Sequence, residues 1–422
     1  MLTEALKQNY IEILKEELVP AMGCTEPIAL AYAAAKAREL LTKAPEKIVV
    51  QASGNMIKNV RCVQIPNSNS MVGIEAAAAL GAFGGDANRE MEVLQTVTDE
   101  DRKTVAAFLR EGNCTVEYLD SEIPLHFIIE ESAGKDTVSV EVRYGHTNLY
   151  AIQKNGVTLY QSPDQEIAAH HADRSGLNID SIKAFADEVP LDEIKPIFER
   201  QIRCNMDIAY EGMAGNYGLG IGRVIKASYA ESTLTRMKAY AAAASEARME
   251  GCDMPVIINS GSGNQGIASS VPIIVYAREN YIPQEKLYRA LAFSSLLTIH
   301  QKEFIGKLSA FCGAVSASCA SGAAITYLAG GTTEQIKNTI GNTLANIPGI
   351  ICDGAKASCA AKIATSLDAS MMAHYLAMDG KSYSAFTGIL KGEAEQTIST
   401  VGYIGKVGMR QTDKEIIQTM LS

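Results

Sequence analysis

The sequence contains no apolar run long enough to span a membrane. The longest runs, at 76–83 and 320–328, fall short of the roughly 20 residues that a membrane-spanning helix needs. The chain does not open with a basic segment followed by an apolar stretch, which would mark a secretory signal; residues 1–19 instead show the spacing of an amphipathic helix. These absences predict a cytoplasmic protein without a membrane partner.

Clustered basic residues are also lacking. Lys and Arg number 38 against 48 Asp and Glu, which gives a formal net charge of -10. Because binding to nucleic acid depends on clustered positive charge, we expect no nucleic-acid partner. The composition, 47% hydrophobic and 20% charged, is that of a folded protein, so the expected ligand is a small molecule. A homodimer is expected only because it is the commonest assembly.

Several signatures of catalysis and cofactor binding are absent. The sequence has no Gly-Lys-Ser/Thr of a Walker loop, no HExxH of a zinc protease, and no Ser-His-Asp set that can be nominated. The tight Cys-x-x-Cys spacing of ferredoxin-type clusters is missing as well. The cysteines that are present must therefore be interpreted from their surroundings.

The periodicity of the sequence predicts an α+β fold. Strand-like alternation occurs at 47–52, 113–118, 125–130 and 137–144 and near 150 and 159, with helical stretches at 25–41, 74–83 and 99–110. From residue 179 onward the strand signal nearly vanishes, and helical stretches follow at 191–208, 224–250, 271–279, 284–300, 314–328, 333–344, 357–378 and 413–420. We expect a smaller N-terminal α/β domain at 1–162 and a larger, mostly α-helical C-terminal domain at 163–422. The polar segment 162–178, which contains His170 and His171, is the expected linker.

Nine cysteines without a secretory signal are more plausibly buried thiols, metal ligands or catalysts than disulfides. Four stand in unrelated contexts and are interpreted as small buried hydrophobic side chains: Cys62, Cys114, Cys204 and Cys252. Cys24 directly precedes the helix expected at 25–41, whose dipole would favour the thiolate and lower the pKa of Cys24. Cys24 is thus a candidate base or nucleophile, with an inert buried thiol as the equally weighted alternative.

Three cysteines of the last third, Cys312, Cys352 and Cys359, lie among small residues. Soft thiolates with small neighbours suit an iron–sulfur cluster. A continuous helix would separate Cys352 from Cys359 by roughly 10 Å along its axis, too far for one small cluster. We therefore expect Asp353 and Gly354 to interrupt the helix, with Cys352 on the loop before it and Cys359 in the first turns after it. From spacing alone, a zinc site or inert thiols are favoured over an iron–sulfur cluster.

Two polar, Gly-rich segments are candidate ligand sites. The loop at 259–266, Asn-Ser-Gly-Ser-Gly-Asn-Gln-Gly, precedes a helical segment and would present backbone N–H groups to a carboxylate, or form a plain turn. The segment at 53–59, with a turn at 53–55, is a candidate to close over a ligand. His146 is expected to end a strand. For His300, Lys302 and Lys307, a capping role at a helix end is at least as plausible as a place in an active site.

Five motifs taken together resemble the L-cysteine desulfidase family, which belongs with the iron–sulfur L-serine dehydratases. They are Ala-Met-Gly-Cys-Thr-Glu-Pro at 21–27, Ser-Gly-Asn-Met-Ile-Lys-Asn at 53–59, Gly-Ile-Glu-Ala-Ala-Ala-Ala-Leu-Gly at 73–81, Ser-Gly-Ser-Gly-Asn-Gln-Gly at 260–266 and Ile-Cys-Asp-Gly-Ala-Lys-Ala at 351–357. They occur in the family's order over nearly the whole chain.

The resemblance implies cluster ligands at Cys312, Cys352 and Cys359 and a proton-abstracting thiolate at Cys24. The implied cofactor is a [4Fe–4S] cluster with one open iron, a Lewis acid that is also sensitive to oxygen. Family members often carry a second cysteine where this chain has Ala314, and Cys319 matches no ligand position. The substrate carboxylate is assigned by our own inference, not by the family, to Ser260, Gly261, Ser262, Gly263 and Asn264 with Asn55 and Lys58.

The implied reaction is a β-elimination without pyridoxal phosphate that converts L-cysteine to pyruvate, ammonia and hydrogen sulfide. Dehydration of L-serine by the same mechanism is the alternative. Two rivals come from other classes of protein. One is a non-catalytic iron–sulfur sensor in which Cys24 is a fourth ligand, and the other is a small-molecule binding protein with structural zinc.

Overall fold

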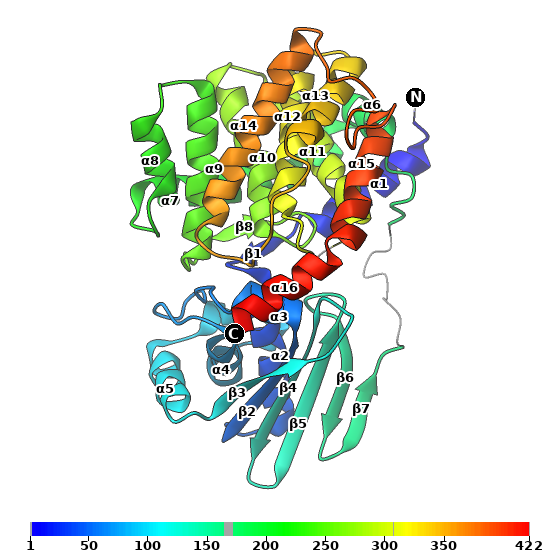
Figure 1. The fold of residues 1–422 in the computed structure, drawn as a ribbon. Coiled ribbons are helices and arrows are strands. Elements are labelled where there is room, and N and C mark those ends of the chain that lie inside the picture. The colour runs from blue at the N-terminus through cyan, green and yellow to red at the C-terminus, as the bar shows by residue number, and fades with distance from the viewer. Residues whose placement is uncertain (1, 164–171, 307, 422) are drawn as a thin grey trace.

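The computed structural model describes residues 2–163, 172–306 and 308–421 and confirms the predicted α+β class (Figure 1). A part built on a six-stranded sheet, here the sheet part, lies below a larger helical part in Figure 1. Of the predicted linker, residues 164–171, with both its histidines, lie outside the described residues, as does Lys307.

The sheet has the strand order β3-β2-β4-β5-β6-β7. Its strands are β2 (Lys47–Ser53), β3 (Cys114–Leu119), β4 (His126–Ala133), β5 (Asp136–Arg143), β6 (Leu149–Lys154) and β7 (Val157–Gln161). β2 and β3 run parallel, and the other neighbouring pairs are antiparallel. Along β5, Val138, Val140 and Val142 are buried and alternate with less buried residues, because one face of the sheet packs on a helix, α2 (Thr25–Leu41).

Four further helices complete the sheet part: α3 (Gly54–Val60), α4 (Ile74–Gly84), the 3-10 helix η1 (Ala87–Thr96) and α5 (Asp99–Arg110). Thr98 begins α5 with a capping box, in which its side chain accepts from the Asp101 N–H while the Asp101 carboxylate accepts from the Thr98 N–H. α4 packs closely on α2 through small residues such as Gly81, where a Cβ would overlap the Ala31 backbone.

The helical part holds the remaining core. Its helices are α1 (Glu4–Glu17), α6 (Ile179–Glu188), α7 (Leu191–Ala214), α8 (Ile221–Ser228), α9 (Thr233–Met249), α10 (Gly263–Glu279), α11 (Gln284–Ile305), α12 (Gly313–Leu328), α13 (Thr333–Asn346), α14 (Cys359–Met378), α15 (Ala394–Tyr403) and the short π-helix η2 (Ile404–Gly408). Tyr10, Ile11 and Leu14 place α1 in this core, although α1 comes first in the chain.

Segments from both ends of the chain pass between the two parts. β1 (Pro20–Met22), between α1 and α2, pairs with β8 (Pro255–Ile257) of the helical part. The last helix, α16 (Arg410–Leu421), packs on α3 of the sheet part (Figure 1). There the buried Lys58 forms an ion pair with Asp413. α1 and α16 thus each contact the part of the molecule that the other end of the chain builds, and the division at 162/163 stays a prediction.

Three local predictions are wrong. The helix predicted at 224–250 is interrupted between α8 and α9, because the Ser232 side chain accepts from the Thr235 N–H and begins a new helix. The turn predicted at 53–55 is the start of α3, so a helix follows β2 directly. The helix predicted at 271–279 begins at Gly263, since its Gly- and Ser-rich first turns are helical too.

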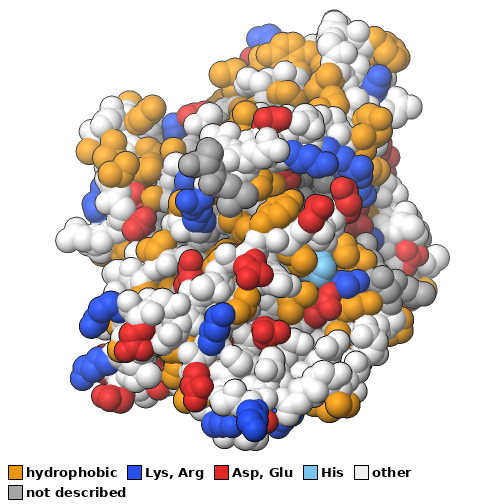
Figure 2. Space-filling view, turned by 60° about the horizontal axis from the view of Figure 1, so that its bottom comes forward, with side chains coloured by type: hydrophobic (Ala, Val, Ile, Leu, Met, Phe, Trp, Pro, Cys, Tyr) orange, Lys and Arg blue, Asp and Glu red, His pale blue; other side chains and the backbone are white. Residues whose placement is uncertain are grey.

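Charges are mixed on the face of the molecule shown in Figure 2. Lys and Arg alternate there with Asp, Glu and hydrophobic side chains, and this view shows no continuous basic surface. In the part of the chain that the structure describes, no helix combines the length and apolar character needed to cross a bilayer.

Candidate functional site

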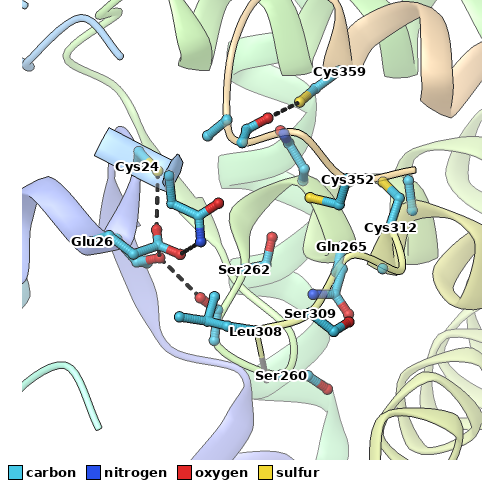
Figure 3. A pocket seen from close by; sticks show the side chains of 18 of the residues that line it. Cys24, Glu26, Ser260, Ser262, Gln265, Leu308, Ser309, Cys312, Cys352 and Cys359 are labelled. Atoms are coloured by element: carbon cyan, nitrogen blue, oxygen red, sulfur yellow. Dashed lines mark hydrogen bonds between the residues drawn. The ribbon is translucent and has the colours of Figure 1, made fainter. Parts of the chain in front are cut away.

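A pocket where the two parts meet gathers four cysteines that the sequence singled out. Cys24, Cys312, Cys352 and Cys359 all line it (Figure 3). In Figure 3, Cys24 lies on one side, Cys312 and Cys352 lie together on the other, and Ser262 stands between them. Thiols that are 288 to 335 residues from Cys24 in the chain (312 − 24 and 359 − 24) therefore share one cavity with it.

Two of these thiols are placed by a short backbone bridge. Phe311 and Ile351 pair antiparallel, and the Cys312 N–H donates to the Ile350 carbonyl at 2.9 Å while the Cys352 N–H donates to the Ala310 carbonyl at 2.7 Å. The bridge brings the loop before α12 against the loop before α14. The side chains of Cys312 and Cys352 are within hydrogen-bonding reach as a result.

The third thiol follows an interruption of the helix, as predicted. Cys352 lies on the loop, and Cys359 is the first residue of α14. Gly354 makes this loop possible because its φ of +97° is one that side chains disfavour, and a Cβ there would overlap the Lys58 carbonyl oxygen. The loop of Cys352 is thus pressed directly onto α3.

A hydrogen bond between two of the thiols and a nearby lysine favour ionisation of one sulfur, that of Cys352. The hydrogen bond from Cys312 lowers the pKa of Cys352, with Lys58 acting in the same direction, and it raises the pKa of Cys312. Burial raises the pKa of Cys359. Lys302 also lines the pocket, and burial lowers its pKa to about 8.

The chemistry of this donor set fits an iron–sulfur cluster. Three thiols line one cavity, two of them adjacent, with the buried cations Lys58 and Lys302 close by. Within the described ranges, however, no three His, Cys, Asp or Glu side chains already stand in the arrangement of a metal site. Cys359 Sγ instead donates to the Gly354 carbonyl oxygen at 3.8 Å.

Cys24 stands just before α2, where the sequence predicted it, but its ionisation differs from the prediction. Its Sγ donates to Glu26 Oε2 at 3.0 Å, and the same carboxylate accepts from Thr25 Oγ1 at 3.0 Å and Asn59 Nδ2 at 3.3 Å (Figure 3). Burial raises the pKa of Cys24 well above its usual range, and Glu26 acts in the same direction. The predicted lowering is wrong, because loss of solvation outweighs the helix dipole.

The Gly- and Ser-rich loop reaches the pocket as expected, with one exception. Asn259 and Ser262 pair across a tight turn, and Ser260, Gly261, Ser262 and Asn264 line the cavity. The Ser262 side chain makes no capping hydrogen bond to α10 and is left available for a ligand. Gly263, the first residue of α10, is not among the lining residues.

Asn55 and Lys58, for which a contact with the substrate carboxylate was predicted, are not among the residues that line the pocket. Residues 54–60 form α3 rather than a loop, and a helix turns successive side chains by about 100°. Lys58 is only 1% exposed and is bound to Asp413 and, at 3.4 Å, to the Ser309 carbonyl. Asn59, the next residue, points to the pocket in its place.

The lining residues also include polar side chains to which the sequence analysis assigned no site role, Glu26, Asn59, Arg248 and Gln265, together with His146, expected only to end a strand, and Lys302, for which a capping role was weighed against an active-site one. Glu26, Asn59 and Gln265 lie within the sequence motifs at 21–27, 53–59 and 260–266, so these motifs could have identified them as site residues. His146 ends no strand, since it lies in the turn between β5 and β6. Arg248 follows an Ala-rich helical run without any distinguishing motif.

The other singled-out residues lie away from the site. His300 is inside α11 and bonds Glu395 on α15 at 2.7 Å, so it does not cap a helix end. Cys319 is buried in α12, where burial raises its pKa to about 12. All nine cysteines are free thiols; Cys114 and Cys252 are buried as expected, Cys204 is half-buried, and Cys62 is exposed, contrary to expectation.

Known proteins match this chain along most of its length. Residues 88–418 match the family model for the serine dehydratase alpha chain. A UPF0597 protein of Lachnoclostridium phytofermentans is 46% identical over 98% of this chain and 100% of its own length. UPF0597 proteins of Treponema denticola and Fusobacterium nucleatum are 45% and 42% identical, each over at least 98% of both chains. The chain therefore belongs to the serine dehydratase alpha chain family, whose members are typically iron–sulfur lyases.

Proposed function

We propose that the protein is a β-eliminating lyase that uses a [4Fe–4S] cluster, without pyridoxal phosphate, to convert L-cysteine to pyruvate, ammonia and hydrogen sulfide. The observation that carries this proposal is the pocket itself. A thiol hydrogen-bonded to a carboxylate, Cys24 with Glu26, faces the thiols of Cys312, Cys352 and Cys359 across one cavity. Membership in a lyase family supports the reaction class.

The proton path starts at Cys24. Glu26 accepts the thiol proton, and the resulting thiolate removes the proton from the substrate Cα. The electron pair forms the Cα–Cβ double bond while the Cβ–S bond breaks with its pair on sulfur. A cluster held by Cys312, Cys352 and Cys359 would supply a Lewis acid for the leaving group. Hydrosulfide takes the proton from Glu26, and the enamine tautomerises and is hydrolysed by one water to pyruvate and ammonia.

L-Serine is the second candidate substrate. The matched family carries serine dehydratase in its name, and the same residues would serve both reactions. A thiol can leave as a thiolate with little help, whereas a hydroxyl must be strongly polarised. Cysteine is preferred because the motif at 21–27 resembles the desulfidase branch.

The test is an anaerobic preparation reconstituted with iron and sulfide. Pyruvate and sulfide would be measured with L-cysteine, and pyruvate with L-serine. Cys24→Ala should retain the iron of the wild type and lose turnover, while Cys62→Ala, an exposed thiol outside the pocket, should change neither. A sensor with Cys24 as a ligand would instead lose iron in Cys24→Ala, and a zinc protein would be colourless. If the cluster-loaded wild type releases pyruvate from neither amino acid, the lyase assignment is wrong.

A further inference from the structure

Arg248, in the last turn of α9, is a buried cation. Its side chain is 2% exposed, and its Nε has no hydrogen-bond partner. Among the described residues, no carboxylate forms an ion pair with its guanidinium. Burying a charge without a counter-charge is strongly unfavourable. An anion from outside the chain would remove this cost.

Arg248 lines the same pocket as the thiols. Its charge acts on the thiols of both Cys24 and Cys359. An anion bound to Arg248 would therefore lie within reach of the proposed base and of the proposed ligand thiols. That is the position required of the carboxylate of a small amino acid.

The first turn of α10 strengthens the argument. A Cβ on Gly263 would overlap Arg248 Nε, so the guanidinium packs directly against the start of this 17-residue helix. The N-terminal end of a helix carries partial positive charge and repels a cation. The two positive groups are compatible when an anion lies between them, and the uncapped Ser262 hydroxyl can donate to the same anion.

We propose that Arg248 binds the α-carboxylate of the substrate, with Ser262 and the first turn of α10 completing the carboxylate site. The planar guanidinium fork matches a carboxylate in a way that a lysine does not. This inference rests on the proposed function and sharpens it. Substrates must carry a free α-carboxylate, so cysteamine and L-cysteine esters or amides are excluded.

Kinetics of the cluster-loaded protein give the first test. Arg248→Gln should raise the KM for L-cysteine by ~100-fold, a typical loss when one partner of a buried charged pair is removed. Arg248→Lys should be intermediate. Arg236→Gln is the matched control, because Arg236 lies on the same helix and bonds Glu231 and Glu279 outside the pocket. Iron content should be equal in all variants.

Thermal stability distinguishes a ligand-binding role of Arg248 from a structural role. Arg248→Gln removes an unpaired buried charge, so its Tm should not fall below that of the wild type; a structural arginine would lower the Tm when replaced. Gly263→Ala keeps the charge but displaces the guanidinium, and it should also raise KM. This second variant keeps the proposal testable if Arg248→Gln fails to fold.

A binding assay separates this proposal from the proposed function. L-Alanine has the carboxylate but no β-leaving group, and ethylamine lacks the carboxylate. L-Alanine should raise the Tm of the full-length wild type and ethylamine should not, and the L-alanine shift should be lost in Arg248→Gln and kept in Arg236→Gln. If this holds while no amino acid is eliminated, the carboxylate site stands and the lyase assignment fails.

Three outcomes would overturn the carboxylate site. One is a Tm shift that is equal with L-alanine and ethylamine, or no Tm shift with L-alanine. Another is a Tm shift with L-alanine that persists in Arg248→Gln. The third is a loss of iron in Arg248→Gln with an unchanged KM, which would make Arg248 a counter-charge for the cluster.

Discussion

The carboxylate of Glu26 accepts hydrogen bonds from Cys24, Thr25 and Asn59. Burial keeps Cys24 protonated, so its thiol can act as a base only after its proton has moved to an acceptor. The carboxylate at 3.0 Å is the acceptor that the structure provides. At the scale of single residues, the ability of Cys24 to act as a base therefore depends on its pairing with Glu26.

Replacing Glu26 with Gln tests this dependence. The amide cannot take up the thiol proton, so kcat should fall by roughly 10²-fold or more, with a smaller change in KM and no change in iron content. Steady-state kinetics with L-cysteine, together with iron analysis, would measure it. An unchanged kcat would show that the proton of Cys24 leaves by another route.

Gly354 is a position that only glycine suits. Its φ is +97°, and a Cβ would overlap a backbone atom, the carbonyl oxygen of Lys58, which a side-chain rotation cannot relieve. Gly354→Ala should therefore lower the free energy of unfolding by ~1–3 kcal/mol and displace the loop of Cys352, with loss of bound iron.

Gly380 offers the matched control for Gly354. It also has a positive φ, +70°, but a Cβ there would meet nothing within 4 Å. Gly380→Ala measures the cost of the backbone conformation alone, by thermal unfolding and iron analysis. Equal effects of the two substitutions would mean that contact with α3 does not hold the loop.

At the scale of elements, α16 is attached to α3 through a buried ion pair. Lys58 is 1% exposed and Asp413 is 13% exposed, and Ile417 packs against Gly54 nearby. α3 in turn supports the loop of Cys352 through the Lys58 carbonyl. The last helix of the chain thus contributes to the position of a proposed ligand thiol that it does not touch itself.

Asp413→Asn should destabilise the protein strongly. It leaves the Lys58 ammonium buried without a counter-charge, which typically costs about 3–5 kcal/mol. Urea unfolding would measure the loss, and the double variant Lys58→Met with Asp413→Leu should recover most of it. Asp379→Asn, in an exposed pair with Lys381, should cost less than about 1 kcal/mol. A small effect of Asp413→Asn would mean that water reaches Lys58.

At the scale of the whole molecule, one buried carboxyl makes stability depend on pH. Glu131 on β4 is fully buried without a hydrogen-bond partner, and burial raises its pKa to about 8, opposed by Arg38 on α2. Between the ordinary pKa of 4.5 and about 8, the folded protein keeps a proton that the unfolded chain releases. The free energy of unfolding therefore falls as pH rises through this window, by at most about 1.4 kcal/mol per pH unit.

Glu131→Gln should remove this contribution. The variant and the wild type should be similar in stability near pH 5, and the variant should be more stable at pH 9. Glu130→Gln, at the exposed neighbouring position, should leave the pH dependence of the wild type intact. Urea unfolding at pH 5, 7 and 9 would measure all three, and parallel curves for Glu131→Gln and wild type would contradict the assignment.

The pocket also belongs to the whole molecule rather than to one part. Cys24, Glu26, Asn59 and His146 reach it from segments of the sheet part and its edge, while the remaining thiols, Arg248 and the 260–264 turn come from the helical part. Sequence periodicity predicted most helices and strands because 3.6-residue and two-residue patterns are local. It gave no signal for Arg248 and left Lys302 between a capping role and an active-site one, because facing a pocket depends on contacts between distant segments.

The sequence by itself determined the α+β class, the helix that begins after Cys24, the interruption between Cys352 and Cys359, and the family motifs. Turn-forming residues, caps and hydrophobic spacing act over a few residues, so these features can be read locally. Only the tertiary structure decided the ionisation of Cys24, the exclusion of Asn55 and Lys58 from the pocket, and the unpaired charge of Arg248. Burial sets these properties, and burial arises only when distant segments pack together.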